Sequence, residues 1–296
     1  MDSPHGAAVK AEDFGLKGPR GWVFRGVSFD APAGSLIAVE GPSGSGRTCL
    51  LLALTGRMKP TEGSAEIGRH RLPKKMAAVR RIAALGPVPG VTDLDPALTV
   101  AEQLREGALL QRRYDAPVRA LFRPRAERAS SAAARIEAVL AAVGLRLESL
   151  PKGPRTSVRD LERLEALRLS VAIALLGGPR LLAVDDTDLK LSDAERAEAW
   201  TLLRHIADSG TTVLAVCSEA PEDALVLRTA AARPAATSTD TGTDADTEPV
   251  TEPVTEPVTE PGTAPATATA AESDADTDTG TDTKGAADAL AEARRA

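Results

Sequence analysis

A run of eight residues early in the chain has the residue types and spacing of a loop that binds a chain of phosphates. It follows a short apolar run, Ser35–Glu40, which predicts a strand, and it precedes a segment with helical character. Glycines let the backbone wrap closely around phosphates, while N–H groups at a helix N-terminus attract negative charge. The flanking strand and helix favour a phosphate site over a Gly/Ser-rich turn without a ligand. The residues are Gly41, Pro42, Ser43, Gly44, Ser45, Gly46, Arg47 and Thr48, followed by Cys49.

Arg47 and Thr48 decide what chemistry this loop supports. The loop matches the pattern G-x-x-x-x-G-K-[ST] at every position except Arg47, where Lys is expected. Thr48 carries a hydroxyl of the kind that holds Mg²⁺ beside the terminal phosphates. Arg47 neutralises phosphate and allows bidentate contact, but its longer planar fork fits poorly around a transition state built for Lys. We therefore expect nucleotide binding to survive this replacement better than fast hydrolysis.

An acidic pair further along the chain supplies the second half of the expected site. The apolar run Arg180–Val184 predicts a strand and is followed by Asp185 and Asp186. A carboxylate at the carboxyl end of a parallel strand can hold Mg²⁺ directly or through water, so Asp185 is the expected metal ligand beside Thr48. Asp186 takes the position of a general base or of a residue that orients water. Alone the pair would be ordinary turn chemistry, but its order after the phosphate loop supports the site.

Strands alternate with helices over residues 1–230, which indicates one α/β domain. A third apolar run, Thr211–Cys217, is rich in β-branched residues and predicts another strand. Buried apolar strands separated by helices form parallel sheets with crossover helices. Residues 99–149 lack strand-like runs, so we expect a helical insertion there. Helical patterns lie at Ser130–Val143, Leu161–Leu176 and Asp193–Asp208.

Composition divides the chain into two parts. The formal net charge is −6, but residues 231–296 carry 14 acidic and 4 basic residues and repeat Thr-Glu-Pro-Val at 247–258. A disordered acidic tail is expected there, with a solvating role favoured over an interaction arm or an autoinhibitory strip. The 2 Cys and 3 His do not suggest a disulfide framework or a His-built metal centre. No membrane-spanning run or secretory signal is visible, so a cytoplasmic protein is expected.

With these motifs in place, the chain resembles the ATP-binding cassette family, the nucleotide-binding subunits of ABC transporters, from about Val9 to Glu222. The resemblance implies a P-loop NTPase fold: a parallel sheet core, an antiparallel N-terminal β region and a helical subdomain at about 99–165. It also implies ATP and Mg²⁺ as cofactors. The segments similar to the family's, in order, are Val27–Ser35, Leu50–Gly63, Leu98–Leu104, Ala174–Pro179 and Gly210–Leu214.

The residues that the family uses for hydrolysis are mostly replaced. Its LSGGQ signature, which caps the γ-phosphate held by the partner subunit, falls on Leu161–Glu165, where there are two glutamates and no glycine. Its loop glutamine falls near Gly86–Pro87, its catalytic Glu on Asp186 and its switch His on Ser218. Trp22 is the candidate for stacking on adenine, and a core role is equally open. These departures predict a degenerate cassette that binds ATP and Mg²⁺ and hydrolyses ATP slowly or not at all.

The resemblance implies the ATP-binding subunit of an ABC-type transporter, peripheral at the inner face of the cell membrane. Its partners would be a transmembrane permease subunit and a second cassette, either an intact one or another copy of this chain. The alternative is a soluble nucleotide-responsive adaptor or regulator, while another P-loop enzyme such as a kinase is disfavoured. A basic stretch at 112–128 has few aromatic residues, so a solvated helical face is favoured over nucleic acid, lipid or the tail as its partner. Cys49 is expected to pack on the helix rather than to react.

Overall fold

The computed structural model describes residues 5–115 and 125–229, so the predicted tail at 231–296 lies outside the described residues. The strands are β1 (Val9–Gly18), β2 (Gly21–Ala31), β3 (Leu36–Glu40), β4 (Glu62–Ile67), β5 (His70–Leu72), β6 (Ala83–Leu85), β7 (Leu181–Val184), β8 (Thr212–Cys217) and β9 (Leu225–Arg228). The helices are α1 (Arg47–Leu54), α2 (Met76–Ile82), α3 (Val100–Asp115), α4 (Arg125–Val143), α5 (Arg163–Leu175) and α6 (Asp193–Asp208), with 3-10 turns at Leu147–Ser149, Gly153–Arg155 and Val158–Asp160.

A five-stranded sheet with the order β6-β7-β8-β3-β9 forms the centre of the fold. All of its strand pairs are parallel, and β7 and β8 are buried along their whole length. Strands covered on both faces are continuously apolar, which explains why these segments could be found in the sequence. The three predicted strands are confirmed as β3, β7 and β8, and the predicted fold class is confirmed with them.

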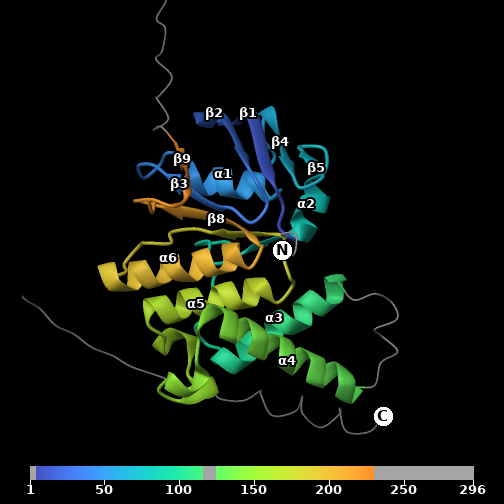
Figure 1. Ribbon diagram of the computed structural model, residues 1–296, viewed down its shortest axis with the longest axis vertical. Helices are drawn as coiled ribbons and strands as arrows, with labels where there is room; N and C mark the ends of the chain where they lie inside the picture. Colours follow the sequence, from blue (N-terminus) through green and yellow to red (C-terminus); the bar gives the residue numbers. More distant parts are fainter. Residues whose placement is uncertain (1–4, 116–124, 230–296) are drawn as a thin grey trace, which may run out of the picture. The chain divides into compact units, whose positions relative to one another are not determined.

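Helices cover one face of this sheet (Figure 1). Side chains from alternate positions of the strands, including Leu182 and Val184 of β7, pack against α5 and α6. Helices α3 and α4 contribute to the same core from further out, and α5 contacts both of them. The described part of the segment at 99–165, which is expected to be helical, therefore consists of helices and turns, apart from one isolated bridge between Thr99 and Ser157.

The opposite face of the sheet is covered by α1 and by a second, antiparallel sheet (Figure 1). This sheet has the order β2-β1-β4-β5 and supplies the predicted antiparallel N-terminal β region. The other alternate positions of the strands, including Leu181 and Ala183, point into this second core. Helix α1 is therefore held between two sheets, which fixes the direction of its N-terminus.

Strand register brings the carboxyl ends of the parallel strands together at one edge. Glu40 at the end of β3 pairs with Cys217 at the end of β8 and with Arg228 at the end of β9. Val184 at the end of β7 pairs with Ala215 on the neighbouring β8. The loops that follow β3, β7 and β8 consequently meet at this edge, where open α/β sheets bind their ligands.

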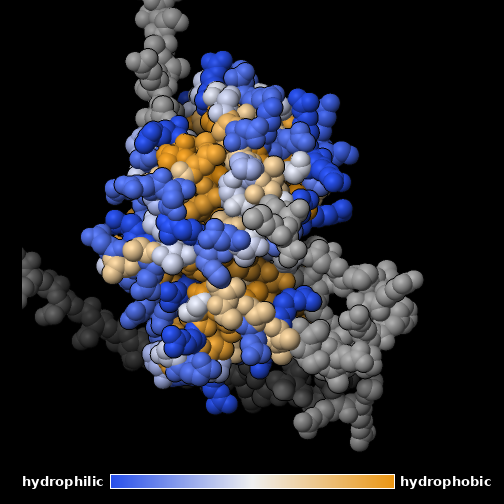
Figure 2. Space-filling model, viewed as in Figure 1, coloured by the Kyte–Doolittle hydropathy of each residue, from blue (hydrophilic) through white to orange (hydrophobic). Residues whose placement is uncertain are grey.

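The surface is mostly polar, with hydrophobic side chains visible beside β9 and in the region of α3 and α5 (Figure 2). Four large hydrophobic residues, Val91, Leu109, Leu110 and Leu189, are about half exposed, at 51%, 59%, 48% and 45%. Across residues 5–115 and 125–229, no helix has both the length and the hydropathy that a membrane span requires.

Candidate functional site

The phosphate loop occupies the connection between β3 and α1, as the sequence predicts. Gly44 and Gly46 have positive φ values of 79° and 82°, a conformation that side chains with a Cβ rarely adopt. A Cβ on Gly46 would also collide with the carbonyl of Val23 in β2, whereas one on Gly44 would meet nothing within 4 Å. Gly46 is therefore required both by the backbone turn and by the close approach of β2.

The loop presents free backbone donors at the start of α1. Ser45 N donates to Pro42 O at 3.1 Å, and Leu50 N donates to Gly46 O at 2.8 Å. Between them, the N–H groups of Gly46, Arg47 and Thr48 have no acceptor within the part of the chain that the structure describes. The first N–H groups of a helix lack intrahelical partners, and together they form a site for an anion.

The base of the loop is fixed from the other side by Thr229, which follows β9. The hydroxyls of Ser45 and Thr229 share a 2.7 Å hydrogen bond, and Thr229 N donates to Glu40 O at 2.9 Å. A Cβ on Gly41 would collide with Thr229, so this glycine is needed for close contact. Thr229 was not identified from the sequence, because nothing in its neighbourhood marks it as part of the loop.

Thr48 and Asp185 meet at the predicted metal position. Thr48 Oγ1 donates to Asp185 Oδ2 at 2.7 Å, and Asp186 N donates to Asp185 Oδ1 at 3.0 Å. Burial raises the pKa of the Asp185 carboxyl above its usual value, and the hydrogen bond from Thr48 partly offsets this effect. A hydroxyl and a carboxylate are the hard oxygen ligands that Mg²⁺ prefers, so the residues fit this ion.

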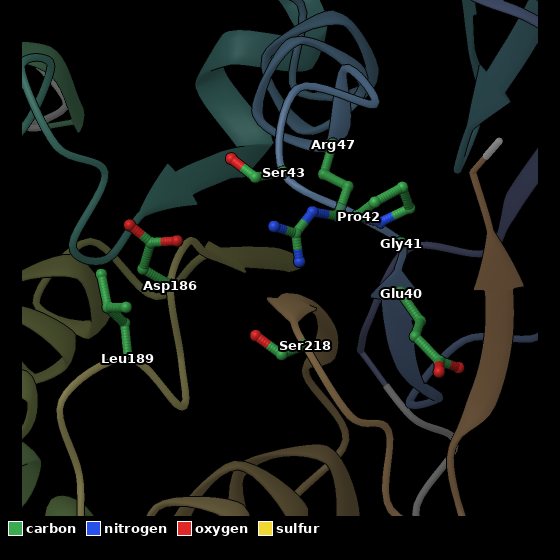
Figure 3. Close-up of a pocket in the computed structure, with 8 residues that line it drawn as sticks. All are labelled: Glu40, Gly41, Pro42, Ser43, Arg47, Asp186, Leu189 and Ser218. Carbon is green, nitrogen blue, oxygen red and sulfur yellow. The ribbon is translucent and has the colours of Figure 1, made fainter. Parts of the chain in front are cut away.

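Arg47 reaches from the loop to the end of β8. Its Nη1 donates to the carbonyl of Cys217 at 2.5 Å. The guanidinium consequently extends across the opening between the loop and Ser218, as Figure 3 shows. This contact depends on the length of the Arg side chain, and the sequence contained no signal for it.

Asp188 holds the segment that follows β8. Its Oδ2 accepts hydrogen bonds from Ser218 N at 2.7 Å and from Glu219 N at 3.3 Å. Asp188 is buried, with 8% of its surface exposed. Sequence analysis missed this role, although a third acidic residue just after Asp185 and Asp186 is a signal that could have suggested it.

A pocket of about 670 Å³ lies at the carboxyl edge of the sheet, and Thr48 and Asp185 are not among the residues that line it (Figure 3). Four loop residues line one side of it, and residues after β7 and β8 line the other. Asp186 is half-buried there and has a positive φ of 48°. The pocket brings together five of the predicted site residues, because its lining consists of Glu40, Gly41, Pro42, Ser43, Arg47, Asp186, Leu189 and Ser218.

Comparison with known proteins identifies the fold and its family. Residues 24–188, more than half of the chain, match the family described as ABC transporter. The chain belongs to this family. It is 32% identical over 191 residues to the ABC transporter ATP-binding/permease protein Rv1747 of Mycobacterium tuberculosis, covering 64% of this chain and 20% of that protein. It is 30% identical over 192 residues to the Nod factor export ATP-binding protein I of Ralstonia nicotianae, covering 65% of this chain and 53% of that protein.

A solved structure supports the same fold. The dimeric structure of MJ0796, described as a bacterial ABC transporter cassette, has a TM-score of 0.58 and 20% sequence identity to this chain. The alignment covers 75% of this chain and 94% of that one. This chain is therefore an ABC cassette in fold, while it spans about a fifth and about half of the two curated relatives above.

Trp22, the candidate for adenine stacking in this ABC cassette, lies on β2 and does not line the pocket. The guanidinium of Arg25 lies over its ring, 4.5 Å from the ring centroid, and Arg25 Nε pairs with Glu62 Oε2 at 3.1 Å. The ammonium of Lys17 lies 5.7 Å from the same ring. Stacking of a base on Trp22 stays a prediction, and on the face covered by Arg25 it would require that side chain to move.

In the segment aligned with the ABC signature, an acidic side chain caps the N-terminus of α5. Glu162 N donates to Glu165 Oε2 at 2.9 Å, at the start of α5. The carboxylate therefore occupies the position near the helix N-terminus that a phosphate would need. This arrangement agrees with the prediction that the segment is a poor cap for a partner's nucleotide.

The loop after β6, where the family has a glutamine, is held by backbone contacts. Asp185 N donates to Pro87 O at 2.9 Å, and Thr92 Oγ1 donates to Gly86 O at 2.6 Å. The loop is thus joined directly to the residue expected to hold the metal, but it offers no glutamine side chain there.

Cys49 lies on α1 and packs partly buried against the second core. Burial, with a contribution from the charge of Asp185, raises the pKa of its thiol. A raised pKa disfavours the reactive thiolate, so the structure supports packing rather than reactivity for this residue.

Proposed function

We propose that this chain binds ATP with Mg²⁺ in the pocket at the phosphate loop, as the ATP-binding subunit of an ABC-type transporter, with weak or absent intrinsic hydrolysis. One observation carries the proposal: the N–H groups of Gly46, Arg47 and Thr48 have no acceptor among the described residues, and they belong to the same turn at the start of α1 as the Thr48 hydroxyl, which donates to Asp185. Free donors suit the phosphates, and the oxygen pair suits the ion that accompanies them.

The Mg²⁺ ion would be held by Thr48 and Asp185. When bound, it would neutralise part of the charge on the phosphates. The described residues contain no group of three or more His, Cys, Asp or Glu side chains able to hold a metal. Such a group is not needed, because Mg²⁺ in nucleotide sites keeps several waters and takes one or two carboxylates together with the phosphates.

Weak hydrolysis is supported by two features of the pocket and by one at the start of α5. Arg47 is bonded to the carbonyl of Cys217 and stands where the pattern has Lys. Asp186 is one methylene shorter than Glu, so its carboxylate reaches less far toward an attacking water. The start of α5 carries the Glu165 carboxylate rather than the donors that would stabilise a partner's phosphate. Each loss of this kind costs a few kcal/mol of transition-state stabilisation, about 3 kcal/mol for one donor.

A permease subunit is the proposed partner, with the cassette bound at the inner, cytoplasmic face of the membrane. The exposed apolar side chains of Val91, Leu109 and Leu110 support a protein partner in the region of α3 and the loop after β6. A second, intact cassette is proposed as the other partner, because two copies of this chain would combine two acidic signature segments. No nucleic-acid partner is proposed.

A soluble nucleotide-responsive regulator is the second candidate function. The hydrogen bond from Glu162 N to Glu165 Oε2 favours it, because a segment whose backbone donor is already capped by its own carboxylate need not bind a partner's nucleotide. Fractionation separates the two candidates. A transporter subunit is expected to sediment with membranes when the membrane protein encoded by the adjacent gene is co-expressed. A regulator is expected to stay in the supernatant.

The proposed function is tested by binding and by turnover on the purified full chain. Calorimetric titration with ATP and Mg²⁺ is expected to show saturable binding, and release of radiolabelled phosphate is expected to stay below about one per second, the low end of ordinary enzymes. Turnover of several per second by the chain alone would contradict weak hydrolysis. Folded protein that binds no nucleotide would contradict the function.

A further inference from the structure

Backbone donors at the start of α1, next to the loop residues that line the pocket, are free, and this part of the loop receives the first phosphates of a nucleotide. In P-loops the backbone N–H groups hold the α- and β-phosphates, and the residue at the Lys position reaches the β- and γ-phosphates. Here the N–H groups of Gly46, Arg47 and Thr48 have no acceptor among the described residues. A diphosphate could therefore bind without breaking any contact of these groups.

One of the five N–H donors of Arg47, the side chain that would serve the last phosphate, is already in use and holds the guanidinium at the end of β8. Arg47 Nη1 is bonded to the carbonyl of Cys217, a residue at the end of β8 and beside Ser218 of the pocket lining. The guanidinium could move from this position toward a γ-phosphate only after the bond to the carbonyl is broken. A Lys side chain is shorter and carries its charge as a compact ammonium, so it would not be held in the same way.

The backbone donors on the far side of the pocket are also in use. Ser218 N and Glu219 N both donate to Oδ2 of the buried Asp188. Two consecutive N–H groups of this kind would otherwise suit a phosphate oxygen. Instead they hold a carboxylate, which places negative charge behind Ser218.

Charge on the far side opposes a third phosphate as well. Asp186 lines the pocket directly, and Asp188 lies behind Ser218. A γ-phosphate adds negative charge next to these carboxylates, and the repulsion is strong where water is partly excluded. On the loop side, the carboxylate of Glu40 pairs with Arg228, and the helix N-terminus and Arg47 favour negative charge.

We propose that this pocket selects a nucleoside diphosphate with Mg²⁺ over the corresponding triphosphate, and that Arg47 and Asp188 determine this specificity. The inference rests on the proposed function, since it names the nucleotide class that the same pocket prefers. Arg47 acts by keeping its donor on Cys217, and Asp188 acts by occupying the N–H groups of Ser218 and Glu219.

Calorimetric titration of the full chain tests the proposal, with ADP and the non-hydrolysable triphosphate AMP-PNP, each with Mg²⁺. The wild type is expected to bind ADP at least about ten-fold more tightly, which corresponds to about 1.4 kcal/mol. Arg47→Lys is expected to bring the two affinities within about three-fold by releasing Cys217. Asp188→Asn removes a charge and is expected to strengthen AMP-PNP binding several-fold with ADP binding unchanged.

Matched substitutions at exposed positions serve as controls. Arg20→Lys and Asp30→Asn make the same chemical changes on the surface and are expected to leave the ADP to AMP-PNP ratio as in the wild type. Equal or tighter binding of AMP-PNP by the wild type would overturn the inference and leave the proposed function intact. An unchanged ratio in Arg47→Lys would overturn the role of Arg47. If the folded chain binds neither nucleotide, the proposed function fails and the inference fails with it.

Discussion

The hydroxyl of Thr48 donates a 2.7 Å hydrogen bond to Asp185 Oδ2, joining two residues 137 positions apart in the chain. Thr48 belongs to the first turn of α1, and Asp185 follows the buried strand β7. Parallel strand register places both at one edge of the sheet, so two hard oxygen ligands lie side by side. This pair connects the phosphate loop to the acidic half of the site.

Thr48→Ala is expected to remove most of the Mg²⁺ dependence of nucleotide binding. Wild-type affinity for ADP is expected to fall about ten-fold when Mg²⁺ is replaced by EDTA, because the phosphates then lose their counter-charge. Thr48→Ala should show less than about a three-fold difference between the two conditions. Thr48→Ser keeps the hydroxyl and serves as the control. An Ala variant with the full Mg²⁺ response would show that Thr48 does not hold the ion.

Gly46→Ala is expected to lower the free energy of unfolding by about 2–5 kcal/mol, through backbone strain and collision with Val23. Gly44→Ala is a matched control, since its φ is similar but no atom lies within 4 Å of the added Cβ. Its cost should be about 1–2 kcal/mol, from strain alone. Urea unfolding followed by circular dichroism measures both. Equal losses in the two variants would mean that β2 does not restrict Gly46.

Asp186→Glu is expected to increase phosphate release from ATP, because the added methylene carries the carboxylate toward the position of an attacking water. Asp186→Asn removes the charge and should reduce release to background, while nucleotide affinity changes little. Release of radiolabelled phosphate at saturating ATP measures the effect. A Glu variant no faster than the wild type would indicate that another group limits the reaction.

Cys217 is expected to resist alkylation at neutral pH. Burial, assisted by the charges of Asp188 and Glu40, raises the pKa of its thiol to about 12. At pH 8 only about one thiol in 10⁴ would then be ionised, and labelling should increase about ten-fold for each pH unit. The Cys49→Ser variant reports on Cys217 alone, and Cys217→Ser reports on the less buried Cys49, which should react faster. Labelling of Cys217 at the rate of a free thiol would contradict its burial.

The sequence predicted the elements whose physical signal is local. Continuous apolar runs marked β3, β7 and β8, and the helix predicted at Asp193–Asp208 is α6. The glycine loop and the acidic pair could be placed at the same site because their order along the chain implies neighbouring strand ends. Strands β1 and β2 of the antiparallel sheet alternate less clearly and could be assigned only through the family resemblance.

The contacts that hold the pocket residues in place could not be predicted, because each joins residues that are far apart in the chain. The bond from Arg47 to the Cys217 carbonyl spans 170 positions, and that from Ser45 to Thr229 spans 184. Backbone acceptors carry no sequence signal. Asp188 had a signal in the sequence, its place just after Asp185 and Asp186, but its role was not predicted.

Binding of nucleotide by the wild type beside Arg47→Ala tests the central claim most directly. Arg47 is the cation among the residues that line the pocket, so its removal should weaken both ADP and ATP binding at least ten-fold in the presence of Mg²⁺. Calorimetry on folded, full-length protein is the measurement. Saturable wild-type binding that is lost or weakened in Arg47→Ala is the predicted result. Equal affinities in the two proteins, or no binding by either, would contradict a nucleotide site at this loop.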